Sequence, residues 1–428
     1  MKKLLIGLLI AVNLFAQAKK ENNETTPSRL ESFTKLQKVI SAVEFLYVDD
    51  ITLNQIVDKA IAGLMNELDA HSAYLDKKAF KQMKITIKGE FSGLGIVISM
   101  KDGALTVISP IDDTPAKKAG VQAGDIILKI NDKSTLKMTI DEAVSLMRGK
   151  KGTPVDITVV RKGEAKPIKI HIIRGIIKIQ SVTAKTINND ILYLRISSFD
   201  ENVATQLTKY IKQYKKTTKG IILDLRNNPG GALDQAIKTV DIFVDSGVIV
   251  SQKGRTKKQN DAYSASPKNT LTKVPMVVLV NGGSASASEI VSGALQDDKR
   301  AIIVGRNTFG KGSVQMLLPI TPDKKEAIKL TIAKYYLPSG RTIQAKGIIP
   351  DIVSYAGKVP QTKDSEFSIK EKDLKKHLEI ELAKVDGKKI KKQEKKNKKL
   401  IITKEDIYQD NQLKTALDVL KALILTNK

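Results

Sequence analysis

The stretch "VPMVVLVNGGSASASEIVSGALQDDKRAIIVG", residues 274–305, decides the fold of this chain. An apolar run leads into two glycines, a pattern of helical period follows, and a second apolar run closes the unit. Upstream, "ILYLRISSF" and "GIILDLR" are also strand-like, and each is followed by a helical segment. Alternation of this kind is typical of an α/β domain with a substantially parallel sheet. We therefore expect an α/β core over residues 176–360.

The chain on either side of this core has a different character. Residues 30–89 carry apolar side chains at helical spacing, for example Ile56 and Leu64, and indicate a helical segment. Residues 90–175 change to short strand-like runs with glycine turns and one helical stretch, "TIDEAVSLMRG", which predict a compact mixed domain. Residues 361–428 are rich in lysine and helical in pattern. The expected fold class is an α/β core with an inserted mixed domain and flanking N- and C-terminal helical segments.

The first residues predict export. "MKKLLIGLLIAVNLFAQA", residues 1–18, combines two lysines, an apolar run and a small-residue ending, which is typical of a secretory signal peptide cleaved after Ala18. A membrane anchor is the alternative, but the apolar run is shorter than the ~20 residues that span a bilayer. Residues 19–29 are polar and are expected to form a disordered linker. We expect a mature protein that is periplasmic or otherwise extracytoplasmic.

Composition excludes several kinds of site. The 428-residue chain has no cysteine, which rules out disulfides, zinc-thiolate sites and a Cys nucleophile, and it has only three histidines. Part of its formal charge of +26 is local, in "KKIKKQEKKNKK" at residues 388–399. A basic run without aromatic residues is typical of a solvated linker or helix face, and nothing in it indicates nucleic-acid recognition. As a binding surface in an exported protein, it would fit anionic lipid headgroups, so peripheral membrane contact is an expectation.

The mixed domain contains a candidate site for peptide tails. Gly93-Leu94-Gly95-Ile96 precedes a strand, and glycine lets successive backbone N–H groups converge on one carboxylate. The strand would offer an open edge to which an extended peptide can add. The motif is weak alone, but together with "AGVQAGDIILKIN" (119–131) and the helical stretch 141–147 it resembles a PDZ domain. PDZ domains bind C-terminal tails, so the resemblance implies protein substrates or partners with an exposed C-terminus.

Ser286 admits two interpretations. With Glu289 it fits the capping box Ser/Thr-x-x-Glu at the start of a helix. A capping box does not explain the preceding glycines, or the small residues from Gly282 to Ser288, which would let a substrate backbone approach closely. A helix N-terminus also supplies unpaired N–H groups and a positive dipole end, which stabilise an oxyanion. From these residues alone, a helix cap and a serine nucleophile both stay open.

A serine nucleophile needs a base, and Lys311 in "GRNTFGKGSVQ" (305–315) is the candidate. The glycine and lysine spacing imitates a phosphate-binding loop, but Gly312 follows the lysine where that loop has Ser or Thr, and a strand follows instead of a helix. A free lysine has a pKa of ~10.4, which is too high for a base near neutrality. We expect burial among Phe309, Val314 and the apolar strands to lower the pKa of Lys311.

Two further features of this segment support Lys311 as a base. Gly310 and Gly312 would leave room for a serine hydroxyl to approach the amine. Gln315 lies four residues on, a spacing that places it on the same face of the chain as Lys311. Its amide could accept a hydrogen bond from the lysine and orient it without adding a charge that would hold the amine protonated.

Four motifs together resemble the carboxyl-terminal processing peptidases, also called tail-specific proteases: "VNGGSASASEIVSGALQD", "GRNTFGKGSVQ", "ILDLRNNPGG" and "YYLPSGRTIQAKGIIPDI". The resemblance extends over residues 30–353 and includes the PDZ domain. It implies that Ser286 is the nucleophile, Lys311 the general base and Gln315 the orienting residue. It also implies that the oxyanion is bound by backbone N–H groups, those of Gly230, Gly231 and Ala287.

The same resemblance implies a crotonase-like α/β protease core and an acyl-enzyme mechanism that needs no metal or cofactor. The terminal helices of such peptidases often mediate assembly, so a homo-oligomer is expected. The competing hypothesis is a catalytically inactive PDZ scaffold of the cell envelope. A scaffold could dispense with Ser286, Lys311 and Gln315, and their joint presence argues against it.

Overall fold

The computed structural model describes residues 28–101, 103–360 and 400–426, which divide into two compact units, one up to Tyr74 and one from Leu75. The first unit holds the helices α2 (Arg29–Leu46) and α3 (Leu53–Asn66), each of which begins with a capping box. The predicted signal peptide, the first residues of the linker and the basic run at 388–399 lie outside the described residues. The short strand β1 (Ala73–Leu75) stands at the boundary, and the helix α4 (Lys77–Lys88) opens the second unit.

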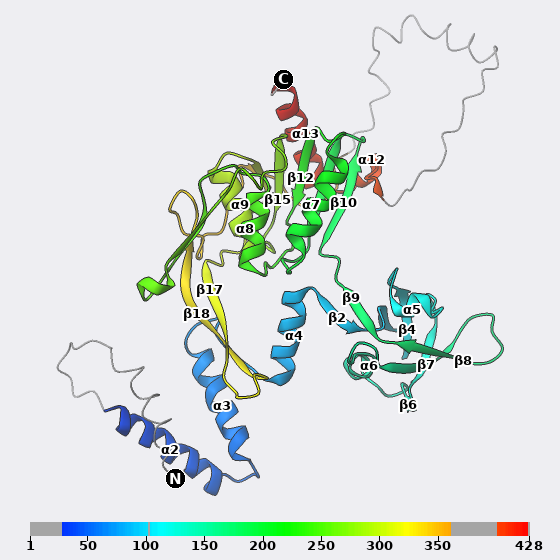
Figure 1. Cartoon of the computed structure of the whole chain (residues 1–428), viewed down its shortest axis with the longest axis vertical. Helices are drawn as coiled ribbons and strands as arrows, with labels where there is room; N and C mark the ends of the chain where they lie inside the picture. The colour runs from blue at the N-terminus through cyan, green and yellow to red at the C-terminus, as the bar shows by residue number, and fades with distance from the viewer. Residues whose placement is uncertain (1–27, 102, 361–399, 427–428) are drawn as a thin grey trace, which may run out of the picture. The chain divides into compact units, whose positions relative to one another are not determined.

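The predicted α/β core is confirmed as a six-stranded sheet (Figure 1). Its first pair is antiparallel and its other neighbours are parallel. In spatial order the strands are β10 (Val182–Ile187), β11 (Ile191–Ile196), β12 (Gly220–Asp224), β15 (Met276–Val280), β16 (Ile302–Gly305) and β19 (Ile352–Val353). Parallel strands need crossover connections, and the helices α7 (Val203–Tyr214), α8 (Leu233–Asp241) and α9 (Ala287–Asp297) lie between them in the chain.

Both faces of this sheet are covered, which explains why its strands are continuous apolar runs. Alternate side chains point to opposite faces. Leu223 and Val278 pack with the helices α7, α8 and α9, whereas Ile222 and Val277 pack with the C-terminal helix α13 (Asn411–Thr426). A short helix, α12 (Lys404–Gln409), precedes α13. The helical prediction for the end of the chain therefore holds for the residues from 404 to 426, although the two-residue strand β19 comes before them.

The structure contains a second, antiparallel sheet, of which the sequence patterns predicted only the strand β17 (Ser313–Pro319). This strand pairs with β18 (Ala327–Tyr336), which also pairs with β13 (Val248–Gly254). The strand β14 (Asp261–Ser264) pairs with β13, and a 3-10 turn, η1 (Lys257–Gln259), connects the two. The sheet matters for the candidate site because β17 begins at Ser313, two residues after Lys311.

The mixed domain forms a separate antiparallel sheet with its own hydrophobic core. Its helices are α5 (Pro115–Lys118) and α6 (Ile140–Met147), and the pair β2 (Glu90–Gly93) and β9 (Gly175–Lys178) lies where the chain enters and leaves. The sheet strands are β3 (Ile96–Lys101), β4 (Ala104–Pro110), β5 (Ile126–Ile130), β6 (Lys133–Ser134), β7 (Pro154–Val160) and β8 (Ile168–Ile173). Over residues 28–101, 103–360 and 400–426, no helix has the length and apolar character needed to cross a bilayer.

Candidate active site

Ser286, Lys311 and Gln315, which lie on different elements, line one cavity of about 680 Å³. The loop before α8 contributes Gly231 to the same cavity, and Leu233 is the first residue of α8. The helix α4 contributes apolar side chains, among them Met83 and Ile87, and Leu75 comes from the strand β1 before it. Three further side chains come from the second sheet: Val314, Leu317 and Tyr335. The three residues predicted to perform the chemistry are therefore brought together beneath a largely apolar wall.

The three serines of the 274–305 stretch have different surroundings. Ser284 and Ser288 are buried, and their hydroxyls donate to the carbonyl oxygens of Leu225 (2.8 Å) and Asn228 (2.9 Å). Both carbonyls lie in the segment that follows β12, so the hydrogen bonds of these two serines connect that segment to the start of α9. Ser286 is half-buried and lines the cavity.

The backbone of Ser286 is strained. Its φ of 53° and ψ of −111° lie in a region that L residues rarely adopt, and such strain is found preferentially at functional sites. Ser286 and Glu289 are arranged as a capping box, yet the Ser286 hydroxyl makes no capping hydrogen bond to the described N–H groups. The Glu289 N–H donates to the carbonyl oxygen of Ser286 (2.9 Å) instead. The geometry favours a nucleophile over a cap.

Glu289 links the candidate nucleophile to the candidate base. Its carboxylate is fully buried and accepts four hydrogen bonds. The donors are Thr308 Oγ1 (2.5 Å) and the backbone N–H groups of Gly310 (2.6 Å), Ser286 (2.8 Å) and Lys311 (2.9 Å). Charge-assisted bonds to a buried carboxylate are strong, so Glu289 fixes the distance between the two backbone segments.

Two expectations about the surroundings of Lys311 are wrong. The Phe309 side chain is 63% exposed and does not bury the lysine. The glycines beside Lys311 make room for the chain itself and not for a serine hydroxyl. A Cβ on Gly312 would lie 2.5 Å from the backbone nitrogen of Gln344, and one on Gly310 would lie 3.2 Å from the carbonyl carbon of Ala345. The Lys311 side chain is half-buried, and Val314 lines the same cavity.

Gln315 is held by two hydroxyls. Its amide nitrogen donates to Ser313 Oγ (2.8 Å) and to Thr331 Oγ1 (3.2 Å). Because the donor end of the amide is committed to these partners, its oxygen is the end that could accept a hydrogen bond from an amine. The arrangement is compatible with the predicted orienting role.

The predicted oxyanion donors divide into two groups. Gly230 lies against the nucleophile candidate, since a Cβ there would be 2.9 Å from Ser286 Cβ, but its N–H donates to Asn228 Oδ1 (2.9 Å). The assignment of the Gly230 N–H to the oxyanion is therefore corrected. Ala287 is the first residue of α9, and a first-turn N–H has no intrahelical acceptor. Gly231, which lines the cavity, and Ala287 stay candidates.

Comparison with known proteins identifies the family. The peptidase family S41 matches residues 190–354, and the PDZ domain matches residues 106–161. The carboxy-terminal-processing protease of Bartonella bacilliformis is 42% identical over 379 residues, which cover 87% of this chain and 86% of that protein. The chain belongs to peptidase family S41. It is a serine-type carboxy-terminal processing protease with a PDZ domain, as the sequence motifs predicted.

A second relative is also a carboxy-terminal processing protease. The carboxy-terminal processing protease CtpA of Bacillus subtilis is 38% identical over 322 residues, which cover 75% of this chain and 68% of that protein. Among solved structures, the photosystem II D1 C-terminal processing protease is 26% identical, with 76% of this chain and 87% of that chain covered and a TM-score of 0.45.

The PDZ domain of this S41 peptidase has an open strand edge and a small cavity at the place where the peptide groove is predicted. The carbonyl oxygens of Leu94 and Gly95 accept hydrogen bonds from Ala116 and Ile111 (both 2.9 Å), which fixes the loop before β3. Among the described strands, β3 pairs only with β4, so its other edge is open. A small cavity of about 100 Å³ lies between the loop residues Gly93 to Ile96 and the α6 side chains, Val144 and Met147 among them.

Two features of the S41 site were not predicted. The spacing of Ser286 and Glu289 indicated only a helix cap, and nothing in it pointed to Thr308 or Lys311 as partners of the carboxylate. The contribution of α4 was also missed, because its apolar residues read as an ordinary core face. It is held to the core by the Glu201 N–H, which donates to the carbonyl oxygen of Ile87 (3.0 Å).

Proposed function

We propose that this S41 peptidase is an exported serine endopeptidase that captures the C-terminal tails of proteins in its PDZ groove. It would cleave near those tails with Ser286 as nucleophile, Lys311 as general base and Gln315 as the residue that orients the lysine. One observation carries the proposal. Of the three serines at the start of α9, only Ser286 faces the cavity that Lys311 and Gln315 share, while the other two hydroxyls are committed to buried carbonyls.

In this mechanism the neutral Lys311 amine accepts the hydroxyl proton as Ser286 Oγ attacks the peptide carbonyl carbon. The tetrahedral intermediate then collapses, its C–N bond breaks, and the lysine ammonium returns the proton to the departing amine. Water hydrolyses the resulting serine ester by the same transfers in reverse order, with Lys311 again the base. The apolar walls of the cavity support this role, because a poorly solvated site disfavours the ammonium form.

Oxyanion stabilisation would come from backbone N–H groups of Ala287 and Gly231. Ala287 begins α9, so the positive end of the helix dipole points at the developing charge. The apolar side chains of α4 and β17 would receive an aliphatic side chain of the substrate beside the scissile bond. An extended tail segment could place its backbone there.

The Ser-Lys assignment is tested with a serine-reactive fluorophosphonate. Wild type is expected to gain one covalent label, mapped to Ser286 by peptide mass spectrometry, and to cleave a peptide that ends in a free carboxylate. Ser286→Ala is expected to do neither. Equal labelling of Ser286→Ala, or a label on another serine, would contradict the assignment. Comparing new C-termini produced by wild type and Ser286→Ala among exported proteins would then identify the substrates.

Export rests on the signal-peptide pattern of residues 1–18. Expression with the full leader should give a mature N-terminus at Lys19 in the extracytoplasmic fraction, and a chain that retains Met1 in the cytoplasm would contradict it. Assembly through the terminal helices and membrane contact through residues 388–399 stay predictions. Sedimentation of the protein with anionic vesicles, compared with neutral ones, tests the second.

A further inference from the structure

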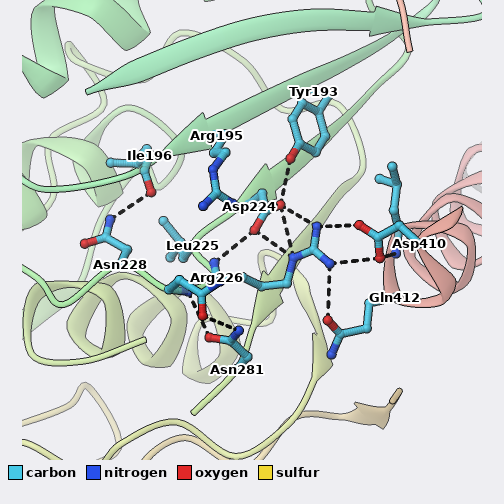
Figure 2. A network of polar contacts seen from close by, with 12 residues as sticks. Tyr193, Arg195, Ile196, Asp224, Leu225, Arg226, Asn228, Asn281, Asp410 and Gln412 are labelled. Carbon is cyan, nitrogen blue, oxygen red and sulfur yellow. Dashed lines mark hydrogen bonds and ion pairs between the residues drawn. The ribbon is translucent and has the colours of Figure 1, made fainter. Parts of the chain in front are cut away.

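A buried ionic network joins the C-terminal segment to the core at Arg226 (Figure 2). Arg226 follows the end of β12, and its side chain is 13% exposed. Its Nε and Nη2 donate to the fully buried carboxylate of Asp224, with distances from 2.6 to 3.1 Å. Its Nη1 and Nη2 also donate to the two carboxylate oxygens of Asp410 (2.9 and 2.8 Å), and Nη1 reaches Gln412 Oε1 (3.2 Å).

These contacts use all the donors of the guanidinium. An arginine has five N–H groups, and the bonds above provide an acceptor for each of them. Asp224 also accepts from Tyr193 Oη (2.7 Å) and lies 3.3 Å from Arg195 Nη1. The positive charges of Arg195 and Arg226 are therefore balanced by the negative charges of Asp224 and Asp410. Without Asp410, Asp224 would be the one carboxylate shared by Arg195 and Arg226, and two N–H groups of Arg226 would lose their acceptor.

Arg226 lies at the base of the loop that supports the nucleophile. The next residue, Asn227, has a φ of 56° and exchanges hydrogen bonds with the Asn281 side chain (2.9 and 2.8 Å). The carbonyl oxygen of Asn228 then accepts from the Ala285 N–H (3.0 Å) and from Ser288 Oγ (2.9 Å). These donors flank Ser286 on both sides.

Asp410 is itself held firmly. It stands between α12 and α13, and its carboxylate also accepts from the Leu413 N–H (3.1 Å). Gln412 Nε2 donates to the carbonyl oxygen of Ser354 (2.9 Å), and Leu413 is buried with the strands of the core sheet. Although burial opposes ionisation, the hydrogen bonds and charge of Arg226 lower the pKa of Asp410.

We infer that Asp410 is a positioning residue of the active site, which holds Arg226 and through it the Asn227–Gly231 loop against Ser286. The residue lies outside the part of the chain that the S41 family matches, residues 190–354. The inference assigns a catalytic purpose to the C-terminal segment, and it rests on the proposed function because it takes Ser286 as the nucleophile.

The test compares Asp410→Asn with Asp418→Asn in the full-length protein. Asp418 undergoes the same chemical change on the same segment, but it forms an exposed pair with Lys414. Asp410→Asn is expected to lower kcat for a tail peptide about tenfold to a hundredfold, since small displacements of reacting groups have effects of that size. KM should change less than threefold, and Asp418→Asn should match wild type. The assays are run well below the melting temperature of every variant.

Two further variants keep the test decisive if Asp410→Asn folds poorly. Asp410→Glu retains the charge and should recover part of kcat. Adding Asp410→Asn to Arg226→Gln should not lower kcat further, because the two residues act as one unit. Unchanged kcat in Asp410→Asn, or independent, multiplicative losses in the double variant, would overturn the inference. Failure of the proposed function looks different: Ser286→Ala would then cleave, whatever the Asp410 variants do.

Discussion

Replacing Ser286 by glycine and by alanine separates its chemical role from its structural one. The residue has a φ of 53°, where a Cβ costs about 1–2 kcal/mol. Glycine removes that strain but adds backbone freedom to the unfolded chain, which costs about 0.5–1 kcal/mol. We therefore expect the free energy of unfolding of Ser286→Gly to equal that of wild type or to exceed it by up to about 1.5 kcal/mol.

Alanine keeps the strained Cβ and loses only a hydroxyl that makes no capping hydrogen bond. Ser286→Ala should thus stay within about 0.5 kcal/mol of wild type, whereas loss of a true N-cap serine would cost about 1 kcal/mol. Both variants lack the attacking oxygen, so both should lose cleavage by about 10⁴-fold or more. The measurements are urea unfolding and cleavage of a carboxylate-ended peptide on the same preparations.

Ser284→Ala is the matched control. It removes a buried hydroxyl that donates to the Leu225 carbonyl (2.8 Å) and accepts from the Asn281 N–H (3.0 Å), so it should cost about 1–3 kcal/mol of stability while retaining part of the activity. Substitution at Ser286 should thus abolish cleavage and leave stability almost unchanged, whereas substitution at Ser284 should lower stability and leave part of the cleavage activity. If Ser286→Gly cleaves at close to the wild-type rate, the reasoning fails, and the nucleophile must be Ser284 or Ser288.

Four other outcomes follow from the site. Lys311→Arg should stay folded by circular dichroism but lose cleavage, because an arginine cannot be deprotonated there; substantial residual proteolysis would refute the Ser-Lys pair. Full-length Ser286→Ala, measured by calorimetry, should bind a tail peptide with an amidated C-terminus more weakly than the same peptide with a free carboxylate, because the loop from Gly93 to Ile96 then loses a charge-assisted contact. Equal affinities for the two peptides would show that the carboxylate is not recognised. Glu289→Gln should lower the free energy of unfolding in urea by about 1–3 kcal/mol and should also lower kcat, because an NH₂ group cannot accept hydrogen bonds from the backbone N–H groups of Ser286 and Lys311. An unchanged kcat would show that Glu289 has a structural role alone. The folded-state pKa of Asp410 is lowered below the unfolded value of ~3.9, so the contribution of Asp410 to stability is complete above about pH 5 and is lost as pH falls through the folded pKa. The stability difference between wild type and Asp410→Asn should therefore shrink from pH 7 to pH 3. A constant difference would contradict the ion pair.

Sequence patterns predicted the parts of this fold that are locally coded. The run from Met276 to Val280 is apolar throughout because both faces of its strand are buried, and the strand-helix alternation determines the parallel sheet. The second sheet escaped prediction for the converse reason. The strand β18 mixes lysines with apolar residues, and the strand β13 with which it pairs lies far upstream. The pairing of β13 with β18, which joins the two hairpins of this sheet, lies outside any local window.

The candidate site divides in the same way. Ser286, Lys311 and Gln315 could be predicted because each stands in a motif whose residue types suit acyl transfer. What holds them in place could not be predicted, because it depends on pairs such as Gly312 with Gln344 and Ser288 with Asn228. The same limit explains the wrong prediction for the Gly230 N–H, whose acceptor is the Asn228 side chain two residues earlier. A hydrogen-bond donor can be counted as free only when its neighbours in space are known.

Asp410 is the extreme case of this limit. In the sequence it is one carboxylate between two helices, and the boundary expected for the core at residue 360 leaves it outside. In the structure, Leu413 and Leu417 of α13 share one hydrophobic cluster with Ile222 and Val277 of the core sheet. Asp410, directly before this helix, and Gln412 within it give Arg226 the acceptors that β12 alone cannot supply. A core cut at residue 360 would expose one face of its sheet and leave a buried arginine with a single carboxylate partner. Arg226, at the base of the Asn227–Gly231 loop, therefore depends for its hydrogen-bond partners on the segment that holds Asp410 and Gln412.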